Sequence, residues 1–307
     1  MAAVAHALEG TMAAGLDYIL SKQARDGSWT EWALPPGSSS TWTTAYVGYQ
    51  LRHLPLKLGL LAASHIAAAA DWLKDHAFAD CGWGYNEVVG SDADTTAYAI
   101  LFMALAGKPV PDIAYTFLAD RQGADGGFST YPPVGEPDSW NVSHPDVTPI
   151  ALLALLTRPA PDREAVQRGI EYALRQKTSL GLWNSFWWNS CLYSTQANLA
   201  LLDAAGIEMP FPAALAHIEP ANAFEAGLLV SSLLYANWDG AQARIGELAD
   251  RLIRHQRPDG SWDTVPILRI VRRDCYDPWM SDDPGPLYAE PDRLFTTATV
   301  LHALATI

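Results

Sequence analysis

The sequence predicts an all-α protein in which six inner helices alternate with about six outer helices to close an (α/α)6 toroid. Three observations lead to this prediction. A turn unit with the pattern Q-x-x-D-G-x-aromatic recurs along the chain, and a recurring unit usually decides the architecture. Charged helical segments alternate with short segments that carry almost no charge. The sequence has no strand-length runs of alternating apolar and polar residues, which argues against a sheet.

The turn units occupy residues 23–29, 122–128 and 256–262, and a looser copy with one extra residue spans 176–183. Each unit follows a segment with apolar residues at spacings of three and four, which is typical of an amphipathic helix. Asp-Gly then ends that helix, because glycine takes positive φ without steric cost.

The segments after the turns are short and rich in Ala and Leu, so we expect them to form the inner ring. Their predecessors, such as 163–175 and 242–255, carry charges on one face and suit the outer layer. The ring is expected to close, because an open array would need polar repeats at its ends. The expected inner helices are Thr41–Leu51, Asp94–Leu105, Asp146–Leu156, Leu192–Leu202, Phe224–Tyr235 and Phe295–Ala305.

Residues 1–307 are expected to form a single domain with a sizeable core. Pro-rich stretches interrupt the units without dividing the chain, and we expect them to be loops at the mouth of the ring. The last stretch is the longest, and we expect it to roof a cavity. These stretches cover residues 34–40, 131–137, 209–212 and 276–291.

Composition narrows the function. A net charge of -14 argues against nucleic-acid binding, which depends on basic residues. Three cysteines without metal-binding spacing favour the reducing cytoplasm. The first twenty residues lack the pattern of a signal peptide. The sequence lacks an uninterrupted run of about 18 apolar residues, so we expect no membrane-spanning helix. Peripheral contact with a membrane and the oligomeric state stay open.

The chain is rich in aromatic residues, with 12 Trp, 12 Tyr and 8 Phe. Two interpretations stay open at this point. The aromatic rings could simply fill the core. Alternatively, they could line a cavity that stabilises positive charge.

Several motifs together resemble those of a known family. The turn units are similar to the QW repeats of squalene-hopene cyclases, oxidosqualene cyclases and class II diterpene cyclases. Residues 81–85 followed by Asp92-Ala-Asp94-Thr95-Thr96-Ala97 resemble the family's G-W segment and its acid motif D-x-D-D-T-A. Residues 182–195 resemble its aromatic stretch. With one toroid only, the chain looks like the single-domain meroterpenoid cyclases of the merosterolic acid synthase type.

The resemblance implies that Asp94 is a general acid that protonates an alkene or epoxide, with Asp92 and Thr95 supporting it. Such an acid needs a dry pocket and a carboxylate stabilised in advance, and the start of an inner helix would help. Plain helix capping is the alternative interpretation of this motif.

The sequence departs from the family at two positions. Thr95 stands where triterpene cyclases have Asp, as in the D-x-D-T-T motif of drimane-forming cyclases. Ile150 stands where squalene-hopene cyclases have the histidine that bonds the catalytic Asp. His144 and Asp146 are therefore candidate substitutes, although a histidine beside a proline is also typical of a surface loop.

Aromatic residues near the expected helix entrances are candidates for binding the substrate and its cation. They are Trp83, Trp140, Phe186, Trp187, Trp188, Tyr193, Trp238, Trp279, Tyr288 and Phe295. Each could instead serve packing. Trp29 and Trp262 of the turn units are expected to brace the outer turns.

We expect no metal site and no cofactor for initiation, because Asp282-Asp283 lacks the third carboxylate of a class I diphosphate site. Mg²⁺ would accompany the substrate only if that substrate is a diphosphate. Arg269, Arg272 and Arg273 could bind an anionic head group or form a solvated face.

The expected partner is a lipophilic isoprenoid or a prenylated aromatic small molecule. Farnesyl or geranylgeranyl diphosphate, giving a drimane or labdane skeleton, is the alternative that the D-x-D-T-T variant suggests. A non-catalytic isoprenoid carrier also stays open, because a fold does not imply a function. A protein-prenyltransferase β subunit is disfavoured, since Asp274 and Cys275 are adjacent and do not have zinc-ligand spacing.

Overall fold

The computed structural model describes residues 2–132, 136, 138–238 and 240–307. Helices dominate these residues, and the four strands are short. The helices are α1 (Ala2–Ser21), α2 (Thr41–Leu51), α3 (Leu56–Asp75), α4 (Ala93–Leu105), α5 (Asp112–Ala119), α6 (Val147–Leu156), α7 (Arg163–Arg175), α8 (Cys191–Ala204), η1 (Ala213–Ala216), α9 (Ala223–Tyr235), α10 (Ala241–Arg254) and α11 (Leu294–Ala305). The strands are β1 (Glu31–Leu34), β2 (Gly37–Ser39), β3 (Leu268–Arg269) and β4 (Leu287–Tyr288). The predicted all-α class is confirmed.

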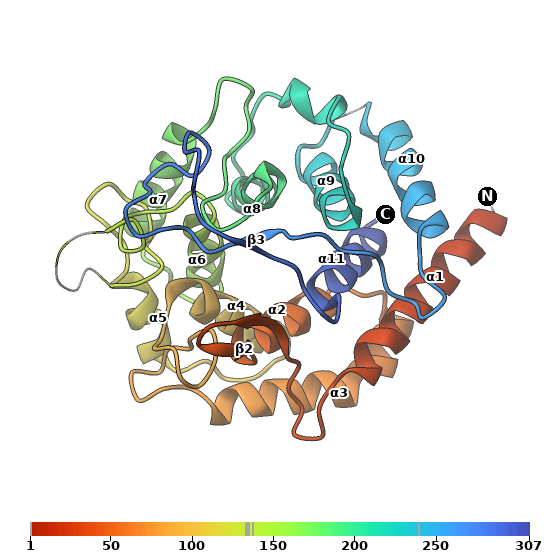
Figure 1. Ribbon diagram of the computed structural model, residues 1–307, viewed down its shortest axis with the longest axis horizontal. Coiled ribbons are helices and arrows are strands. Elements are labelled where there is room, and N and C mark those ends of the chain that lie inside the picture. The colour runs from red at the N-terminus through yellow and green to blue at the C-terminus, as the bar shows by residue number, and fades with distance from the viewer. Residues whose placement is uncertain (1, 133–135, 137, 239) are drawn as a thin grey trace.

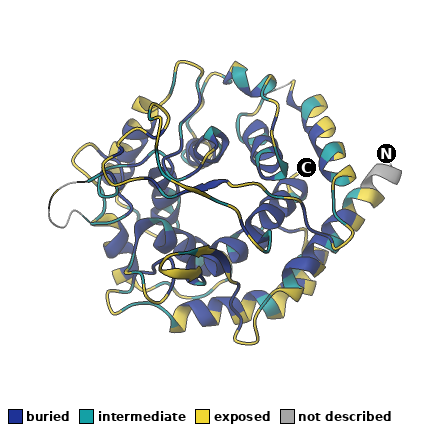
Figure 2. Cartoon of the chain, viewed as in Figure 1, coloured by how far each residue is buried: buried dark blue, intermediate teal, exposed yellow. Residues whose placement is uncertain are grey.

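Six helices form a closed ring at the centre of the molecule (Figure 1). In chain order α2, α4, α6, α8, α9 and α11 each pack against the next, and α11 packs back against α2. These are the six helices predicted from the uncharged segments, with ends within a residue or two of the predicted ones. Figure 2 shows that they are buried over nearly their whole length.

The outer layer consists of α1, α3, α5, α7 and α10, each packed against helices of the inner ring. Exposed residues in Figure 2 are concentrated on these helices and on the loops. The predicted segments 163–175 and 242–255 are α7 and, within a residue, α10. Between α8 and α9 the outer position holds only the short 3₁₀ helix η1. Pro210 and Pro212 precede it, and proline cannot contribute an N–H to a longer helix.

Four tryptophans brace the outer helices in the same way. Trp29, Trp83, Trp183 and Trp262 each donate the indole N–H to a backbone carbonyl ten residues earlier, over 2.6–2.9 Å. The predicted bracing role of Trp29 and Trp262 is confirmed. Trp83 belongs to the same set, so its predicted place at a substrate cavity is wrong.

The glutamines of the turn units join neighbouring repeats. The Gln122 side-chain amide donates to Gly126 O in its own turn and to Ala165 O in α7. Gln256 does the same to Gly260 O and to Thr11 O in α1. Gly260 has a φ of 90°. A Cβ there would lie 2.2 Å from Ala14 O, so this close approach of turn and helix requires glycine.

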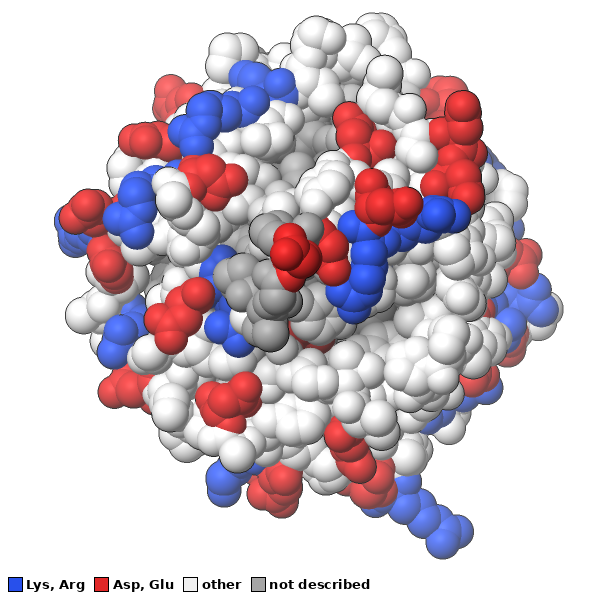
Figure 3. Space-filling view, turned by 60° about the vertical axis from the view of Figure 1, so that its left-hand side comes forward, with Lys and Arg blue, Asp and Glu red and all other residues white. Residues whose placement is uncertain are grey.

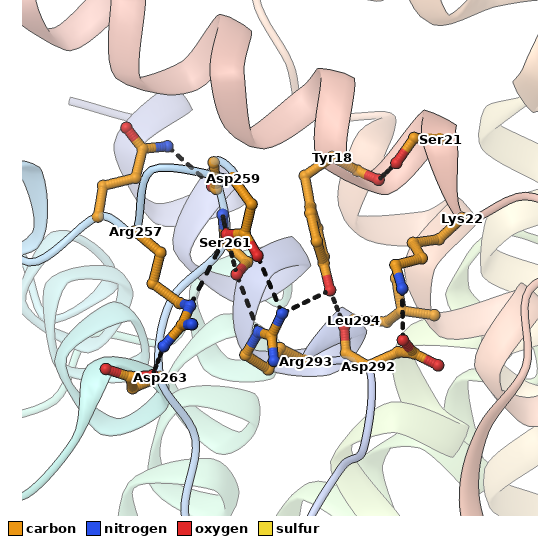
Figure 4. A network of polar contacts seen from close by, with 12 residues as sticks. Tyr18, Ser21, Lys22, Arg257, Asp259, Ser261, Asp263, Asp292, Arg293 and Leu294 are labelled. Carbon is orange, nitrogen blue, oxygen red and sulfur yellow. Dashed lines mark hydrogen bonds and ion pairs between the residues drawn. The ribbon is translucent and has the colours of Figure 1, made fainter.

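The end of α1 and the start of α11 meet beside this last turn (Figure 4). Arg293 at the start of α11 donates to Asp259 Oδ2 over 3.0 Å and to Tyr18 OH over 3.2 Å. Tyr18 OH donates to Asp292 O, and Lys22 Nζ lies 2.6 Å from Asp292 Oδ1. The first helix is thus bonded to the last turn unit, which closes the ring.

Among the described helices, α3 alone is long and apolar enough to cross a membrane by length and composition. One face of α3, including Leu58, Ala62 and Ile66, is buried. The helix packs against α1, α2 and α4. Its place in the wall of the ring accounts for this buried face, whereas Leu56, Leu60 and Leu61 of the same helix are exposed.

Candidate active site

An apolar cavity of about 310 Å³ lies at the start of α4. Its walls come from the β1–β2 hairpin, the start of α2, the segment before α4, Thr130, Tyr131, Trp140, Trp187 and the β3 segment. The lining residues are Leu34, Pro35, Pro36, Trp42, Tyr85, Val89, Asp92, Asp94, Thr95, Thr130, Tyr131, Trp140, Trp187, Leu268 and Ile270. Two carboxyl groups in an otherwise aromatic and aliphatic lining are the feature to explain.

Asp92 caps α4 and fixes the acid motif. Its Oδ1 accepts the Thr95 N–H over 2.7 Å, and its Oδ2 accepts the Thr95 hydroxyl over 2.9 Å. The backbone N–H of Ala93 donates to Thr130 O over 2.9 Å. The capping interpretation therefore applies to Asp92, whereas Asp94 lies in the first turn of α4 with its side chain at the cavity wall.

The pKa of Asp94 is raised well above its ordinary value. Burial is the main cause, because it penalises the carboxylate, and the neighbouring charges of Asp92 and Asp146 add to it. The Trp42 indole N–H makes no hydrogen bond among the described residues, but it lies close enough to Asp94 to act in the opposite direction. Asp94 is partly accessible because it faces the cavity. Burial therefore favours the protonated form of this acid, and the cavity lets a ligand reach it.

The two predicted substitutes for the missing histidine do not hydrogen-bond to Asp94. His144 is buried and bonds Thr130 Oγ1 over 2.9 Å and Ser139 O over 2.7 Å. His144 therefore makes no hydrogen bond to Asp94, and because it is buried the surface-loop alternative is wrong. Asp146 accepts the backbone N–H groups of Phe186 and Trp187 and acts on Asp94 only through its charge.

Ile150 leaves the histidine position without a donor. It is buried one turn into α6 and lines another, much smaller cavity with Tyr46, Tyr98 and Tyr193.

Burial raises the pKa of Asp146 to about 6 and of Asp92 to about 7. The charge state of both neighbours of Asp94 therefore changes near neutral pH.

Of the ten predicted aromatic residues, Trp140 and Trp187 line the cavity at the start of α4. Their rings meet edge to face at 5.1 Å. Trp188 and Phe295 lie one layer deeper and contact the lining residue Trp42 at 5.8 and 4.7 Å. They support the cavity wall and do not form it.

The other aromatic side chains predicted at the cavity lie elsewhere in the structure. Phe186 stacks on His144 at 3.9 Å, and the Tyr193 hydroxyl bonds that of Tyr98. Trp238 stacks on Phe211 at 4.5 Å.

Trp279 and Tyr288 belong to the Pro-rich segment that was expected to roof the cavity. Trp279 is partly exposed and donates its indole N–H to Ser185 O, and Tyr288 lies in β4. Leu268 and Ile270, just before this segment, line the cavity instead.

Sequence reasoning missed Trp42, Tyr85 and Tyr131, as well as the apolar wall contributed by the β1–β2 hairpin. Trp42 had a usable signal, because it occupies the first turn of inner helix α2 as Asp94 does in α4. The Pro-rich stretch 34–40 indicated a loop at the mouth of the ring, but its strand pairing had no signal, because short irregular strands leave no periodic pattern.

Basic and acidic side chains lie next to one another over the face shown in Figure 3. The three arginines considered for a head group have partners within the protein. Arg272 pairs with Asp274 and Asp283, and Arg273 pairs with Asp138 at 2.6 Å.

Arg269 is buried, donates to Asn189 Oδ1 and lies over the Trp279 ring at 5.5 Å. A cluster of three or more His, Cys, Asp or Glu side chains suited to a metal ion does not occur in the described part of the chain.

Comparison with known proteins identifies the fold. No family model matches the chain. A segment of 113 residues, 35% of this chain, is 33% identical to drimenyl diphosphate synthase from Streptomyces showdoensis and spans 20% of that protein's length. Among solved structures, a protein from Actinoplanes is 29% identical with a TM-score of 0.83, covering 98% of this chain and 100% of that one.

A variant of the type II terpene cyclase MstE from Scytonema superimposes with a TM-score of 0.86 at 23% identity, covering 99% of this chain and 98% of that one. MstE has also been solved with geranylgeranyl dihydroxybenzoate as its substrate. The helical ring and these matches show the fold of the type II terpene cyclases. In particular, the chain is similar over its whole length to the single-domain cyclase MstE, so the predicted resemblance is confirmed.

Proposed function

We propose that the chain is a class II terpene cyclase, an isomerase that folds a linear isoprenoid into rings. The observation that carries the proposal is Asp94, a protonated carboxylic acid in the wall of an apolar cavity lined by aromatic rings. Burial and neighbouring carboxylates keep its proton in place at neutral pH. An alkene held in this cavity meets that acid without competing water.

The chemistry balances as an isomerisation. Asp94 gives its carboxyl proton to one carbon of the terminal alkene, or to the oxygen of a terminal epoxide, and becomes a carboxylate. The neighbouring carbon becomes a cation, which successive internal alkenes attack to form rings. A base takes a proton from the final cation, and Asp94 regains one before the next turnover.

The residues around Asp94 stabilise the carboxylate that remains. Asp94 lies in the first turn of α4, where the helix dipole favours negative charge. The Trp42 N–H adds to this stabilisation. Asp92 and Thr95 bond to each other and hold the backbone of the turn.

The aromatic lining stabilises the cation without offering a nucleophile. The rings of Trp42, Tyr85, Tyr131, Trp140 and Trp187 face the cavity. A cation over such a ring gains about 2 kcal/mol when it is desolvated. This lining favours substrates whose reacting part is a hydrocarbon chain.

We propose a prenylated aromatic as the substrate, supported by the likeness to MstE, which binds such a molecule. The alternative is farnesyl or geranylgeranyl diphosphate, supported by the Asp92-Ala-Asp94-Thr95-Thr96 motif and the match to drimenyl diphosphate synthase. Protonation itself requires no cofactor, and Mg²⁺ would enter only with a diphosphate. Both substrates share the step at Asp94.

We also propose that residues 1–307 form one (α/α)6 toroid equivalent to the acid-bearing domain of two-domain class II cyclases. The closed contacts of the six inner helices support this assignment.

The test compares wild type with Asp94→Asn, using Asp112→Asn as the matched control, because Asp112 lies in the first turn of outer helix α5. Each protein is incubated without metal and then with Mg²⁺, with farnesylated and geranylgeranylated aromatics, the free diphosphates and squalene, and products are analysed by mass spectrometry. We expect a ring-containing isomer from wild type and Asp112→Asn, and none from Asp94→Asn. Tight binding without conversion by wild type would instead indicate a carrier.

A further inference from the structure

A chain of hydrogen bonds with one fixed direction runs behind the cavity wall. Ser139 O can only accept, so the Nε2 of His144 donates to it over 2.7 Å. Burial lowers the pKa of His144 to about 4, so the ring is neutral and its Nδ1 is an acceptor. The Thr130 hydroxyl therefore donates to Nδ1 over 2.9 Å. Having used its proton, Thr130 Oγ1 accepts the indole N–H of Trp187 over 2.8 Å.

The backbone of Trp187 is fixed separately. Asp146 Oδ2 accepts the N–H groups of Phe186 and Trp187, each over 2.8 Å. The Phe186 ring stacks on the His144 imidazole at 3.9 Å with planes 13° apart. Trp187 is thus held at its backbone by one polar group and at its indole by another. The Thr130 hydroxyl is thus the partner that fixes the polar edge of the indole ring.

The same threonine also touches the acid motif. Thr130 O accepts the backbone N–H of Ala93, the residue between Asp92 and Asp94. Thr130, Trp187 and Asp94 all line the cavity at the start of α4. One residue therefore couples the position of an aromatic wall to the position of the acid.

Resting on the proposed function, we propose that Thr130 and His144 are positioning residues that hold the Trp187 ring plane against the cation formed at Asp94. They donate no proton to the substrate. Their contribution is to the fate of the cation. With Trp187 held in place, the isoprenoid substrate closes all its rings. With the Trp187 side chain free to rotate, the cation loses a proton early or is captured by water.

Thr130→Val isolates this contribution. Valine has nearly the shape of threonine, and the backbone bond from Ala93 is kept, whereas the Trp187 N–H and His144 Nδ1 lose their partner. We expect substrate consumption within about threefold of wild type, with at least half of the product shifted to less cyclised or hydroxylated molecules. Thr130→Ser keeps the hydroxyl and should restore the wild-type products.

Two further variants guard against a folding defect. Trp187→Phe keeps an aromatic ring but removes its anchor, and we expect the same product shift. Thr157→Val is the matched control. Thr157 Oγ1 also bonds an aromatic side chain, the hydroxyl of Tyr115, but it lies at the C-terminal end of α6. Its products should equal those of wild type.

Nuclear magnetic resonance of ¹⁵N-labelled histidine and tryptophan tests the chain without any turnover. We expect the Nε2–H tautomer at His144 and an indole N–H signal of Trp187 that moves in Thr130→Val and returns in Thr130→Ser. An Nδ1–H tautomer, an unmoved indole signal, or a wild-type product pattern from Thr130→Val would each overturn the proposal. A wild type that cyclises nothing would overturn the proposed function, while the resonance data would still decide whether Thr130 orders Trp187.

Discussion

Two inner helices begin beside buried carboxyl groups, and they differ in what those groups are free to do. At the start of α11, Glu31 accepts the N–H groups of Asp292 and Leu294, and Glu290 accepts that of Thr296 and bonds its hydroxyl. At the start of α4, Asp92 is bonded in the same manner, but Asp94 has only the Trp42 indole and the open cavity beside it.

The pKa does not separate the two regions. Burial raises the pKa of Glu31 to about 8 and also raises that of Glu290, as it does for Asp94. What distinguishes Asp94 is access to the cavity and the scarcity of hydrogen bonds to its carboxyl group. A raised pKa keeps a proton on the group, and only access lets a substrate take it.

The largest expected effect comes from replacing Asp94, the accessible carboxyl group of the two regions. Removing a general acid costs about 10³-fold in rate, in the middle of the usual range, so Asp94→Asn should lose at least that much in kcat. Its thermal midpoint should not fall, because an uncharged amide replaces a carboxyl that is already uncharged. Initial rates and melting curves check both statements, and an active Asp94→Asn would place the acid elsewhere.

Glu290→Ala tests the opposite region. It leaves the buried Thr296 N–H without this acceptor and its hydroxyl with only the 3.4 Å contact to Thr264 Oγ1, so we expect a loss of about 2 kcal/mol in the free energy of unfolding. The rate per folded molecule should stay within twofold of wild type. Urea titration and active-site-normalised kinetics separate the two quantities; a specific loss of rate would give Glu290 a catalytic role.

Trp42→Phe sharpens the contrast by removing the one donor beside Asp94. A hydrogen bond to a charged group is worth about 1.5–3 kcal/mol, so the rate should fall about 10- to 100-fold. The pKa of Asp94 should rise further, because the carboxylate loses its support. The alkaline fall of the kcat/KM profile should therefore move to higher pH. A lower or unchanged limb would show that Trp42 does not support the carboxylate.

The last expected effect concerns the pH dependence of stability. Glu31 has a folded-state pKa of about 8 against an ordinary value of 4.5. The folded state therefore binds the proton more tightly, and stability falls as pH rises through that window. Asp92, Asp94, Asp146 and Glu290 act with the same sign. Glu31→Gln should narrow the difference in urea midpoint between pH 5 and pH 8. An unchanged difference would remove Glu31 from this account.

The inner ring was predictable because its helices are uncharged and follow a repeated turn. The acid motif was predictable for the same reason, since it begins one of those helices. The cavity walls were not, because they join segments far apart in the chain, such as Pro35, Tyr131 and Leu268. Trp83 and Trp187 look alike in sequence, yet one braces an outer helix and the other lines the cavity. Only the direction of the side chain separates them.

The bonds from Gln256 to Thr11 and from Arg293 to Tyr18 mean that no repeat is terminal in space. A linear array can fray from its ends, one repeat at a time. In this protein the first and the last repeat pack against each other. If either of them unfolds, the other loses that interface as well. We therefore expect unfolding to be a single cooperative transition. A circular permutant, with the two chain ends joined and the chain cut at another exposed turn, should keep this single transition. Each repeat would still pack against a repeat on either side.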